Sequence, residues 1–422
     1  MVRNYTDYLK ASADALKGSP IPKPFAVWSA LSAVAGALGR RVWFPMANYD
    51  IRSNLFITLI ANPGRNKSVS LILPYSKVFT KLTTPVGTTE DDSNFNSGLD
   101  KYGLRKYPLY SIQDRITPEK LAVDMCKLQR IDMRLSSPQI EEFHDASVTL
   151  VTSEFGAFMS RTDRYLQMFL TDMWDSKDSY SHKTKTAGEY VINGPCLNWI
   201  ACATPEQFVE NLPEDARSQG LLSRMIPVFY DGPKIAQSLL QTKVSDNTIE
   251  NLRHDLGAIA KMYGPMTFDP DCFDEVNADI EAGIPPEPTA PHLAEYNQRR
   301  ISHHIKVAMS VSASRRGTRK IMLEDWEYTK ELMRDMEKHM PKALEGFGMG
   351  RTGKIAYDMT VWLNDTLFSN GRSHLLIKHF KRELLRKIPN PGELTQTIQA
   401  MEDSGYIKVE GNLVFPCRKD VT

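Results

Sequence analysis

The residues best suited to chemistry follow a short apolar run. Asn54 to Ala61 reads N-L-F-I-T-L-I-A, which predicts a buried strand, and the residues after it lead through Asn-Pro-Gly into a helix-like stretch. A loop in this position can surround phosphates with backbone N–H groups, while a lysine reaches the terminal phosphates and a hydroxyl binds the metal. We therefore predict a phosphate-binding P-loop, with Lys67 and Ser68 in the last two roles.

This loop matches the pattern G-x-x-x-x-G-K-[ST] only in part, because Ala61 and Asn66 occupy the glycine positions. Asparagine tolerates a left-handed backbone better than most residues, so position 66 is compatible with the loop. The alternative is a plain strand–turn–helix corner in which Pro-Gly only makes the turn. The P-loop interpretation assigns nucleotide contacts to Asn62, Pro63, Gly64, Arg65, Asn66, Lys67 and Ser68.

A partner carboxylate is expected at the end of a neighbouring strand. Val148 to Thr152 predicts a second buried strand, and Glu154 is the acid at its tip. Such a carboxylate would hold Mg²⁺ through water, together with Ser68, and would orient the attacking water. Ser153 stands where an aspartate is expected, which predicts a looser or different metal coordination. The alternative is a surface glutamate that caps the following helix.

Polar residues near two further strands could act on the terminal phosphate. Leu197 to Thr204 predicts a third strand, and the Thr204 side chain would contact the γ-phosphate or the attacking water, or simply N-cap the helix beginning at Pro205. Arg217 and Arg224 precede another apolar run, which suits a charge-stabilising finger acting on a neighbouring subunit's nucleotide. Ordinary salt bridging is the alternative for both arginines.

Charge is segregated later in the chain. Residues 268–298 contain eight acids and no Lys or Arg, whereas residues 299–320 contain seven Lys or Arg, two His and no acid. Arg299 or Arg300, on a predicted helix, would be a lid arginine that contacts nucleotide. Electrostatic pairing with the acidic segment is the alternative for the whole basic block. The basic residues predicted to form a short loop suited to DNA phosphates are Arg315, Arg316, Arg319 and Lys320.

The last seventy residues predict three helices and a hairpin. Gly411-Asn412 between two β-branched runs is typical of a hairpin turn, so this region predicts a helix-turn-helix with a β-wing, a winged helix. Four basic residues share one face of a predicted helix: Lys378, Lys381, Arg382 and Arg386. In a winged helix such a face meets the DNA backbone, and protein docking is the alternative.

The order of these elements predicts an α/β fold. Short apolar strands separated by helical segments favour a mainly parallel sheet covered on both faces, as in a P-loop NTPase core. We expect a helical N-terminal region over 1–50, the ATPase core over 51–235, a helical lid over 236–348 and the winged helix over 349–422. His303 and His304 are expected to pack rather than bind metal, because no third ligand lies at useful spacing.

Composition excludes several classes of protein. The 422 residues are 41% hydrophobic and 24% charged, which supports a folded chain with more than one domain. The net charge of +1 argues against a globally basic nucleic-acid binder, so any charge-based function must be local. Five scattered cysteines support neither a disulfide framework nor a zinc site, and no apolar run is long enough for a membrane span. A cytoplasmic location, in a bacterial host for a phage or plasmid protein, is the simplest expectation.

Several blocks in order resemble bacteriophage and plasmid P-loop ATPases of the replicative DNA helicase or primase–helicase type. The resemblance spans about residues 20–320 and includes N-L-F-I-T-L-I-A-N-P-G-R-N-K-S (54–68), T-S-E-F-G (152–156) and A-T-P-E-Q-F (203–208). The remaining blocks are 24–43, I-T-P-E-K-L (116–121), H-K-T-K-T-A-G (182–188) and G-L-L-S-R-M (220–225).

This resemblance implies ATP hydrolysis in a ring-forming ATPase of the RecA or additional-strand (AAA+) type, with ATP and Mg²⁺ as ligands. Lys67 and Ser68 would bind phosphate and Mg²⁺, and Glu154 would activate water. Thr204 would sense the γ-phosphate, and Arg224 would be the trans-acting finger. The departures at Ala61, Asn66 and Ser153 bear on the rate of hydrolysis rather than on nucleotide binding.

The first functional hypothesis is an ATP-driven motor that closes into a homo-oligomeric ring, most often sixfold, around single-stranded or forked DNA during phage or plasmid replication. A primase or another replication protein would be a further partner. Lys183 and Lys185 are candidate pore residues that track the DNA backbone, with a helix-linking surface loop as the alternative.

Two other hypotheses use the same residues differently. The chain would be a non-processive ATP switch, such as a helicase loader or replication initiator, if ATP controlled assembly without unwinding. It would be a structural winged-helix repressor if the ATPase were a remnant, and Lys67→Ala would then leave all function intact.

Overall fold

The structure is a computed structural model of the chain. It describes residues 3–82, 109–113, 115–128, 130–136, 139–159, 163–184, 188–212, 220–236, 243–290, 293–344, 351–388 and 390–417. The polar stretch 83–106, which the sequence predicts to be a loop, lies entirely outside these residues. The chain divides into two compact units, Met1–Leu344 and Glu345–Thr422. The second unit begins close to the expected boundary at 349, whereas the N-terminal helices and the expected lid belong to the same unit as the sheet.

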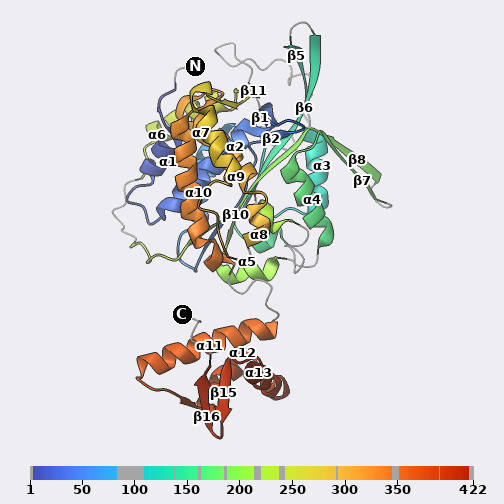
Figure 1. The fold of residues 1–422 in the computed structure, drawn as a ribbon. Helices are drawn as coiled ribbons and strands as arrows, with labels where there is room; N and C mark the ends of the chain where they lie inside the picture. The colour runs from blue at the N-terminus through green and yellow to red at the C-terminus, as the bar shows by residue number, and fades with distance from the viewer. Residues whose placement is uncertain are drawn as a thin grey trace. The chain divides into compact units, whose positions relative to one another are not determined.

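A parallel sheet forms the centre of the first unit (Figure 1). Its strand order is β10-β3-β9-β6-β4, and each neighbouring pair is parallel. The strands are β3 (Phe56–Ala61), β4 (Ser111–Gln113), β6 (Gln139–Thr152), β9 (Pro195–Ala203) and β10 (Met225–Tyr230). The three strands predicted from apolar runs are therefore present, and β9 lies between the other two, β3 and β6. This confirms the α/β class and the mainly parallel sheet.

Both faces of the sheet are covered, as the apolar strands require. Helix α2 (Lys23–Leu38) contacts β3, β6, β9 and β10, and its residues from Phe25 onward are buried. Asn198 of β9 faces α2, where its amide donates to the Ser32 carbonyl over 3.0 Å. The next residue, Trp199, lies on the other face and packs against Phe155 and Phe158. The all-round apolar pattern of α2 thus reflects complete burial.

Further helices of the first unit pack around this core. They are α1 (Tyr8–Ala15), α3 (Pro118–Leu128), α4 (Arg164–Asp175), α5 (Pro205–Asn211), α6 (Asp246–Ile259), α7 (Phe273–Glu281), α8 (Ala294–Asn297), α9 (Arg300–Arg316) and α10 (Leu323–Ala343). Helix α9 packs on α2, and α10 packs on β10. The small strands are β1 (Val42–Pro45), β2 (Asp50–Arg52), β11 (Gly264–Pro265), β12 (Thr267–Phe268) and β13 (Lys320–Ile321). Among the residues that the structure describes, none of the helices has the length and hydropathy needed to cross a bilayer.

Two antiparallel hairpins extend from the amino-terminal edge of the sheet. Strand β5 (Arg130–Ser136) pairs with the first half of β6, which continues beyond the point where β9 begins. Strands β7 (Ser179–Thr184) and β8 (Gly188–Asn193) form the second hairpin, which ends just before β9. In Figure 1 the β5–β6 hairpin projects from the unit, whereas the β7–β8 hairpin lies beside α3, which contacts β8, and α4, whose Phe169 packs on Tyr180 of β7. The predicted alternative of a helix-linking loop around Lys183 is therefore replaced by a β-hairpin.

The stretch after the phosphate-loop candidate is helical but not an α-helix. A 3-10 turn at Ser68–Leu71 leads into a π-helix at Ile72–Val78 and a second 3-10 turn at Phe79–Leu82. Pro74 lies in the π-helix and has no N–H to donate, so a regular i to i−4 ladder cannot continue through it. The predicted helix-like stretch is thus present with different hydrogen bonding.

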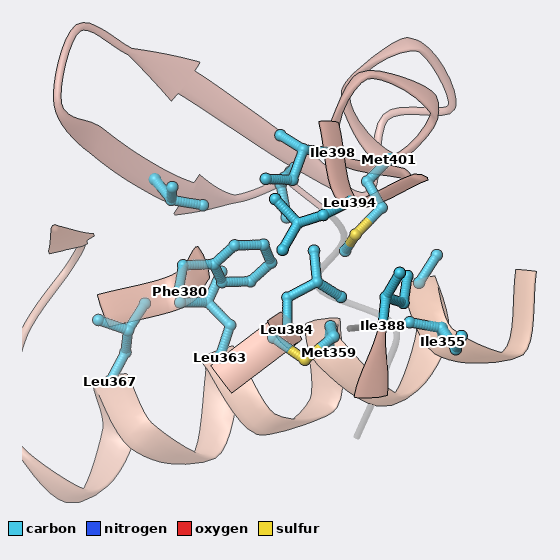
Figure 2. Close-up of a cluster of buried hydrophobic side chains, with 13 residues drawn as sticks. Ile355, Met359, Leu363, Leu367, Phe380, Leu384, Ile388, Leu394, Ile398 and Met401 are labelled. Carbon is cyan, nitrogen blue, oxygen red and sulfur yellow. The ribbon is translucent and has the colours of Figure 1, made fainter. Parts of the chain in front are cut away.

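In its described residues, 351–388 and 390–417, the second unit contains three helices and a three-stranded antiparallel sheet of order β14-β16-β15. Its elements are α11 (Arg351–Ser369), β14 (Leu375–Leu376), α12 (Ile377–Lys387), α13 (Pro391–Asp403), β15 (Ile407–Glu410) and β16 (Leu413–Pro416). Figure 2 shows apolar side chains from all three helices meeting in one core, including Leu363, Phe380, Leu384 and Ile398. The three helices and the hairpin at Gly411-Asn412 match the sequence prediction, and β14 is an additional strand.

Candidate functional site

Three strands place the main candidate residues along one edge of the sheet. In the register, Ile60 of β3 lies opposite Ala203 of β9, and Ala201 of β9 lies opposite Thr152 of β6. The chain segments that follow these strands therefore leave the sheet side by side at its carboxyl edge. Two strand spacings separate β3 from β6, which is about 10 Å. This edge is where ligands bind in open parallel sheets.

The backbone of residues 62–68 is curved in the way the prediction required. Asn66 has φ 53° and Gly64 has φ 76°, so both adopt the left-handed region. A Cβ at Gly64 would have no atom within 4 Å, which leaves open space beside the loop. The Asn66 side chain donates to the Pro20 carbonyl over 2.9 Å, and this bond anchors the loop to the chain that precedes α2. The role of Pro20 was not predicted, because nothing local in the sequence links it to Asn66.

Lys67 lies against its own loop and is only partly exposed. Its Nζ donates to the carbonyl oxygens of Ala61 over 2.6 Å and Asn62 over 3.2 Å. Burial lowers the pKa of Lys67 from its usual value, and the neighbouring Cys202 opposes this effect. A partly desolvated ammonium interacts more strongly with an anion than a fully solvated one. Ser68, the next residue, is exposed at the start of the first 3-10 turn.

Glu154 follows β6 with its side chain exposed. It stands at the N-cap position of the turn Phe155–Ala157, but its side chain makes no capping hydrogen bond there. The capping alternative is therefore wrong. Directly after it, Phe155 is buried and stacks on Trp199 with ring centroids 5.4 Å apart, and it also contacts Phe208 at 5.1 Å. This aromatic cluster holds the end of β6, and with it the backbone of Glu154, against β9.

Thr204 is the N-cap of α5. Its hydroxyl oxygen accepts from the Gln207 N–H over 3.2 Å, and the Gln207 side chain accepts from the Thr204 N–H over 3.3 Å. This capping box confirms the N-cap alternative, and glutamine three residues after threonine was its sequence signal. A threonine hydroxyl that accepts one hydrogen bond still has a proton to donate. Thr204 thus remains a potential donor at the carboxyl edge.

The site fits a magnesium ion that is bound mainly by the phosphates of a nucleotide better than one that is bound by protein side chains alone. Within the described ranges, no group of three or more His, Cys, Asp or Glu could hold a metal. Magnesium commonly binds through one or two protein oxygens, several waters and the phosphates of a substrate. The Ser68 hydroxyl and the Glu154 carboxylate are exposed oxygen donors of this kind, following β3 and β6 at the same edge.

Arg224 lies at the opposite edge, where β10 begins beside the start of β3. Its guanidinium pairs with both carboxylate oxygens of Asp175, the shorter distance being 2.9 Å, and donates to the Gly220 carbonyl over 2.9 Å. It also lies over the Trp174 ring, and only 6% of its side chain is exposed. The salt bridge predicted as the alternative is therefore present and commits the cation within its own chain, and the trans-acting finger role stays a prediction.

Arg299 and Arg300 do not approach Lys67. The Arg299 guanidinium lies 6.0 Å from the ring of Trp174, whose carbonyl accepts from Asn54 just before β3. A six-residue strand separates this edge from the loop by about 20 Å. Arg300 is buried in an ion pair with Glu337. The prediction that one of these arginines contacts nucleotide is therefore wrong. The N-terminal end of α9, which carries both, lies toward the amino edge of the sheet and not beside Lys67.

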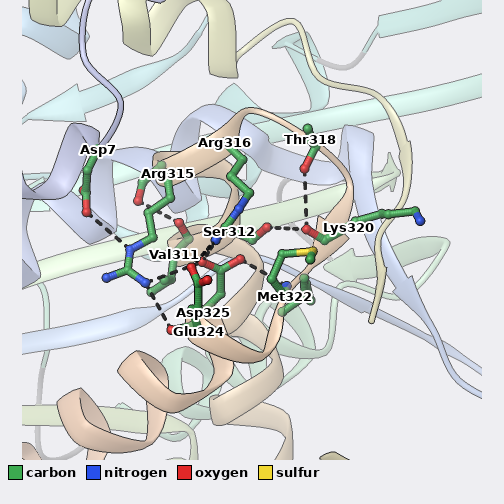
Figure 3. Close-up of polar contacts among 12 residues, drawn as sticks. Asp7, Val311, Ser312, Arg315, Arg316, Thr318, Lys320, Met322, Glu324 and Asp325 are labelled. Carbon is green, nitrogen blue, oxygen red and sulfur yellow. Dashed lines mark hydrogen bonds and ion pairs between the residues drawn. The ribbon is translucent and has the colours of Figure 1, made fainter. Parts of the chain in front are cut away.

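Arg315 and Arg316 form the last turn of α9 rather than a loop, and acids surround them (Figure 3). Arg315 contacts Asp7 at 3.3 Å and Asp325 at 3.5 Å, and Arg316 contacts Glu324 at 2.6 Å and Asp325 at 2.5 Å. The predicted DNA contact is therefore not supported here. The alternative prediction was electrostatic pairing of the basic block with the acidic segment 268–298. Arg315 and Arg316 do pair with acids, but these acids lie outside that segment. From the acidic segment, Asp269 pairs with Lys320.

The remaining predicted DNA residues fall into two groups. Lys183 lies in β7 opposite Glu189 of β8, near the end of the hairpin. Lys185 and Arg217 lie outside the described residues. The second group is on α12: Lys378, Lys381, Arg382 and Arg386 are all exposed, and Arg386 pairs with Glu383 over 2.7 Å.

His303 and His304 are buried, as predicted. The His303 ring lies 2.8 Å from the Ser223 carbonyl, and the His304 ring lies 2.9 Å from the Arg300 carbonyl. Burial lowers the pKa of each to about 3, with the positive charge of Arg300 adding to the effect at His304. Both rings are therefore neutral packing groups.

Acid should destabilise the first unit through these histidines. In the unfolded chain both histidines become protonated below about pH 6.5, whereas in the folded protein they stay neutral down to about pH 3. Protons therefore bind preferentially to the unfolded state, and the free energy of unfolding falls as the pH is lowered between these two values. Each histidine contributes about 1.4 kcal/mol per pH unit. We expect His304→Leu to reduce the slope of the unfolding free energy against pH, measured by urea unfolding between pH 6 and 4. The reduction should correspond to one proton, about 1.4 kcal/mol per pH unit. Parallel curves for the two proteins would contradict this assignment.

The geometry thus brings together the loop 62–68, Glu154 and Thr204, and it separates them from Arg224 and Arg299. No family model matches the chain, and no curated protein sequence matches it.

Proposed function

We propose that this protein is an ATP-hydrolysing, ring-forming DNA helicase or translocase of phage or plasmid replication. The observation that carries the proposal is the strand order of the sheet, in which β9 separates β3, the strand before Lys67, from β6, the strand before Glu154. Additional-strand ATPases are named for an inserted strand at this place. The order therefore supports the resemblance independently of the sequence blocks on which it was based.

The roles follow from position along the carboxyl edge. Backbone N–H groups of residues 62–67 and the Lys67 ammonium would bind phosphates, with Ser68 as an oxygen ligand for Mg²⁺. Bound Mg²⁺ would neutralise charge that develops on the phosphates. Glu154 would orient water, and the Thr204 hydroxyl would donate toward the terminal phosphate or that water. Lys67 must exchange its two loop carbonyls for phosphate oxygens when nucleotide binds.

The hairpin β7–β8 supports a DNA-tracking role. Lys183 lies in β7 near the end of this hairpin, which extends from the edge of the sheet opposite the nucleotide edge, and Lys185 follows two residues later in the sequence. Cations on a hairpin suit contact with a DNA backbone in a ring pore.

Removing these two cations should uncouple DNA from hydrolysis. We expect Lys183→Ala with Lys185→Ala to keep basal ATPase and to lose most of the stimulation by single-stranded DNA, because Lys183 lies in β7 and not at the carboxyl edge of the parallel sheet. Lys177→Ala, which removes an exposed lysine paired with Asp172, is the control. Stimulation that is unchanged in the double variant would exclude the hairpin from DNA contact.

The second unit supports the proposal as a winged-helix module. Its order of helix, strand, helix, helix and two-stranded hairpin is the arrangement expected of a winged helix. The exposed basic residues of α12 favour DNA as its partner.

An ATPase assay with and without single-stranded DNA, on the wild type and Lys67→Ala, tests the main proposal. We expect DNA-stimulated hydrolysis by the wild type, and a loss of at least about 100-fold in Lys67→Ala because the phosphate-binding cation is gone. Strand displacement on a forked duplex is the second readout. Equal hydrolysis by wild type and variant would remove the site assignment.

A helicase loader or replication initiator that uses ATP as a switch is the second candidate. The commitment of Arg224 to Asp175 favours it, because this arginine is then absent as a trans-acting group that accelerates hydrolysis. Ser153 in place of an aspartate points the same way. Tight ATP binding with negligible turnover and no strand displacement would select the switch.

A further inference from the structure

Helix α12 divides into an apolar face and a basic face. Phe380 and Leu384 are fully buried in the core of the second unit (Figure 2). Lys378, Lys381 and Arg382 lie on the opposite side and are exposed. Among the described residues these three have no ion-pair partner, unlike Arg386 and Lys387 of the same helix, which pair with acids. The free positive charge of α12 is therefore concentrated in its first half.

Helix α13 has a different character. It contains no Lys or Arg, and Leu394, Ile398 and Met401 pack into the same core. Its exposed side carries neutral hydrogen-bonding side chains: Thr395, Gln396 and Gln399. The Gln399 amide donates to Asp403 over 2.9 Å, near the end of the helix. In the N-terminal half the exposed side chains are thus the uncharged Thr395 and Gln396, while the acid of the first turn, Glu393, is half-buried.

The two helices are joined by a short turn. Only residues 388–390 separate the end of α12 from the start of α13, and the Asn390 side chain accepts from the Gly392 N–H over 3.0 Å. The helices also contact each other. Two packed helices joined by three residues form a helix-turn-helix, in which the first helix crosses the DNA backbone and the N-terminal part of the second enters the major groove.

We propose that the second unit recognises a specific sequence in duplex DNA, with α12 on the phosphates and α13 reading base edges through Gln396 and its neighbours Thr395 and Gln399. Glutamine and threonine carry both donors and acceptors, and glutamine pairs bidentately with adenine in the major groove. Cations on one helix and neutral amides on the next match the division between backbone contacts, which position, and base contacts, which specify.

Helices α12 and α13 favour duplex over single-stranded DNA, because the described residues of neither helix include an exposed Phe, Tyr or Trp. Sequence-tolerant binding of single strands relies on aromatic side chains on which bases stack. Helix α13 has no aromatic residue, and Phe380 of α12 is buried. The inference rests on the DNA-binding part of the proposed function and goes further, because a sequence-reading unit would direct the ATPase to a chosen duplex site.

The test is a selection by the full-length chain from duplexes with 20 randomised base pairs, followed by binding titrations of the enriched duplex, a scrambled duplex and the matching single strand. We expect the wild type to enrich one sequence and to prefer it over the other two. Gln396→Ala should weaken binding of the enriched duplex by about 5- to 100-fold and leave the scrambled duplex unchanged.

Loss of the α12 charge should have a different effect. Lys378→Ala, Lys381→Ala and Arg382→Ala together should weaken binding of every duplex and lower the slope of log affinity against log salt by about 2.7. Lys408→Ala, on an exposed lysine paired with Glu410 in β15, is the matched control. Thermal unfolding of each variant confirms that the second unit still folds.

Four results would overturn the inference. The first three are no enriched sequence, a preference of the wild type for the single strand, and equal effects of Gln396→Ala on enriched and scrambled duplexes. Unchanged duplex binding by the triple α12 variant would also overturn it and would leave protein docking as the role of this face. ATPase activity is measured on the same preparations, so failure of the nucleotide site is distinguished from failure of duplex recognition.

Discussion

Glu154→Gln should retain ATP binding and lose hydrolysis by about 10²- to 10⁴-fold, the usual contribution of a positioned general base. The amide keeps the size of the side chain but cannot accept a proton from water. Because Glu154 is exposed and makes no capping bond, the substitution should leave the fold unchanged. Turnover by phosphate release and binding by a fluorescent ATP analogue are the two measurements.

The matched control for this prediction is Glu206→Gln, which changes another acid near the same edge, in the first turn of α5. We expect its turnover to stay within about twofold of wild type, since a surface position away from the reacting groups has little effect. Lys67→Ala should differ from Glu154→Gln by losing nucleotide binding as well. If Glu154→Gln hydrolyses ATP at the wild-type rate, the catalytic acid must be another residue and the role given to the end of β6 is lost.

Glu337→Leu should destabilise the first unit by about 3–5 kcal/mol, because it leaves a buried guanidinium without its counter-charge. Glu337 accepts from Arg300 Nε over 2.7 Å and Nη2 over 2.9 Å, and from the Tyr296 hydroxyl over 3.0 Å. Both charged side chains are 4% exposed. Arg300 also donates to the Gly283 and Pro286 carbonyls. The pair therefore joins α9, α10 and the turn after α7.

Urea unfolding followed by tryptophan fluorescence measures this loss. Glu327→Leu is the control, since Glu327 is an exposed acid on the same helix and its partner Lys330 keeps a second acid, Asp279, and we expect a change below about 1 kcal/mol. A loss in Glu337→Leu no larger than in the control would show that the buried network does not stabilise the junction. The same experiment on the double variant Arg300→Met with Glu337→Leu should recover part of the stability, because no unpaired charge then remains.

Local residue patterns predicted much of the fold. The apolar run before Asn62 became β3, the runs before Ser153 and Thr204 became β6 and β9, and Asn66 adopted the left-handed backbone that its type allows. These features depend on side-chain hydrophobicity and on φ/ψ preferences within a few residues. The capping box at Thr204 is equally local, and its glutamine was visible in the sequence.

Two candidate roles could not be decided in this way. The function of an arginine depends on which acid lies beside it, and Asp175 lies 49 residues before Arg224 in the chain. The acids around Arg315 and Arg316 come from α10 and from the residue before α1. No local pattern pairs such distant residues, because only the packing of helices on the sheet brings them together.

By itself, the sequence determined the residue types at the strand ends, the local conformation of the loop at 62–68 and the helices and hairpin of the second unit. Only the tertiary structure decided that Lys67, Glu154 and Thr204 share one edge while Arg224 and Arg299 lie at the other. The reason is that the order and direction of the strands determine at which edge of the sheet each strand ends. Strand order and direction arise from long-range backbone pairing, and backbone N–H and C=O groups are the same for every sequence.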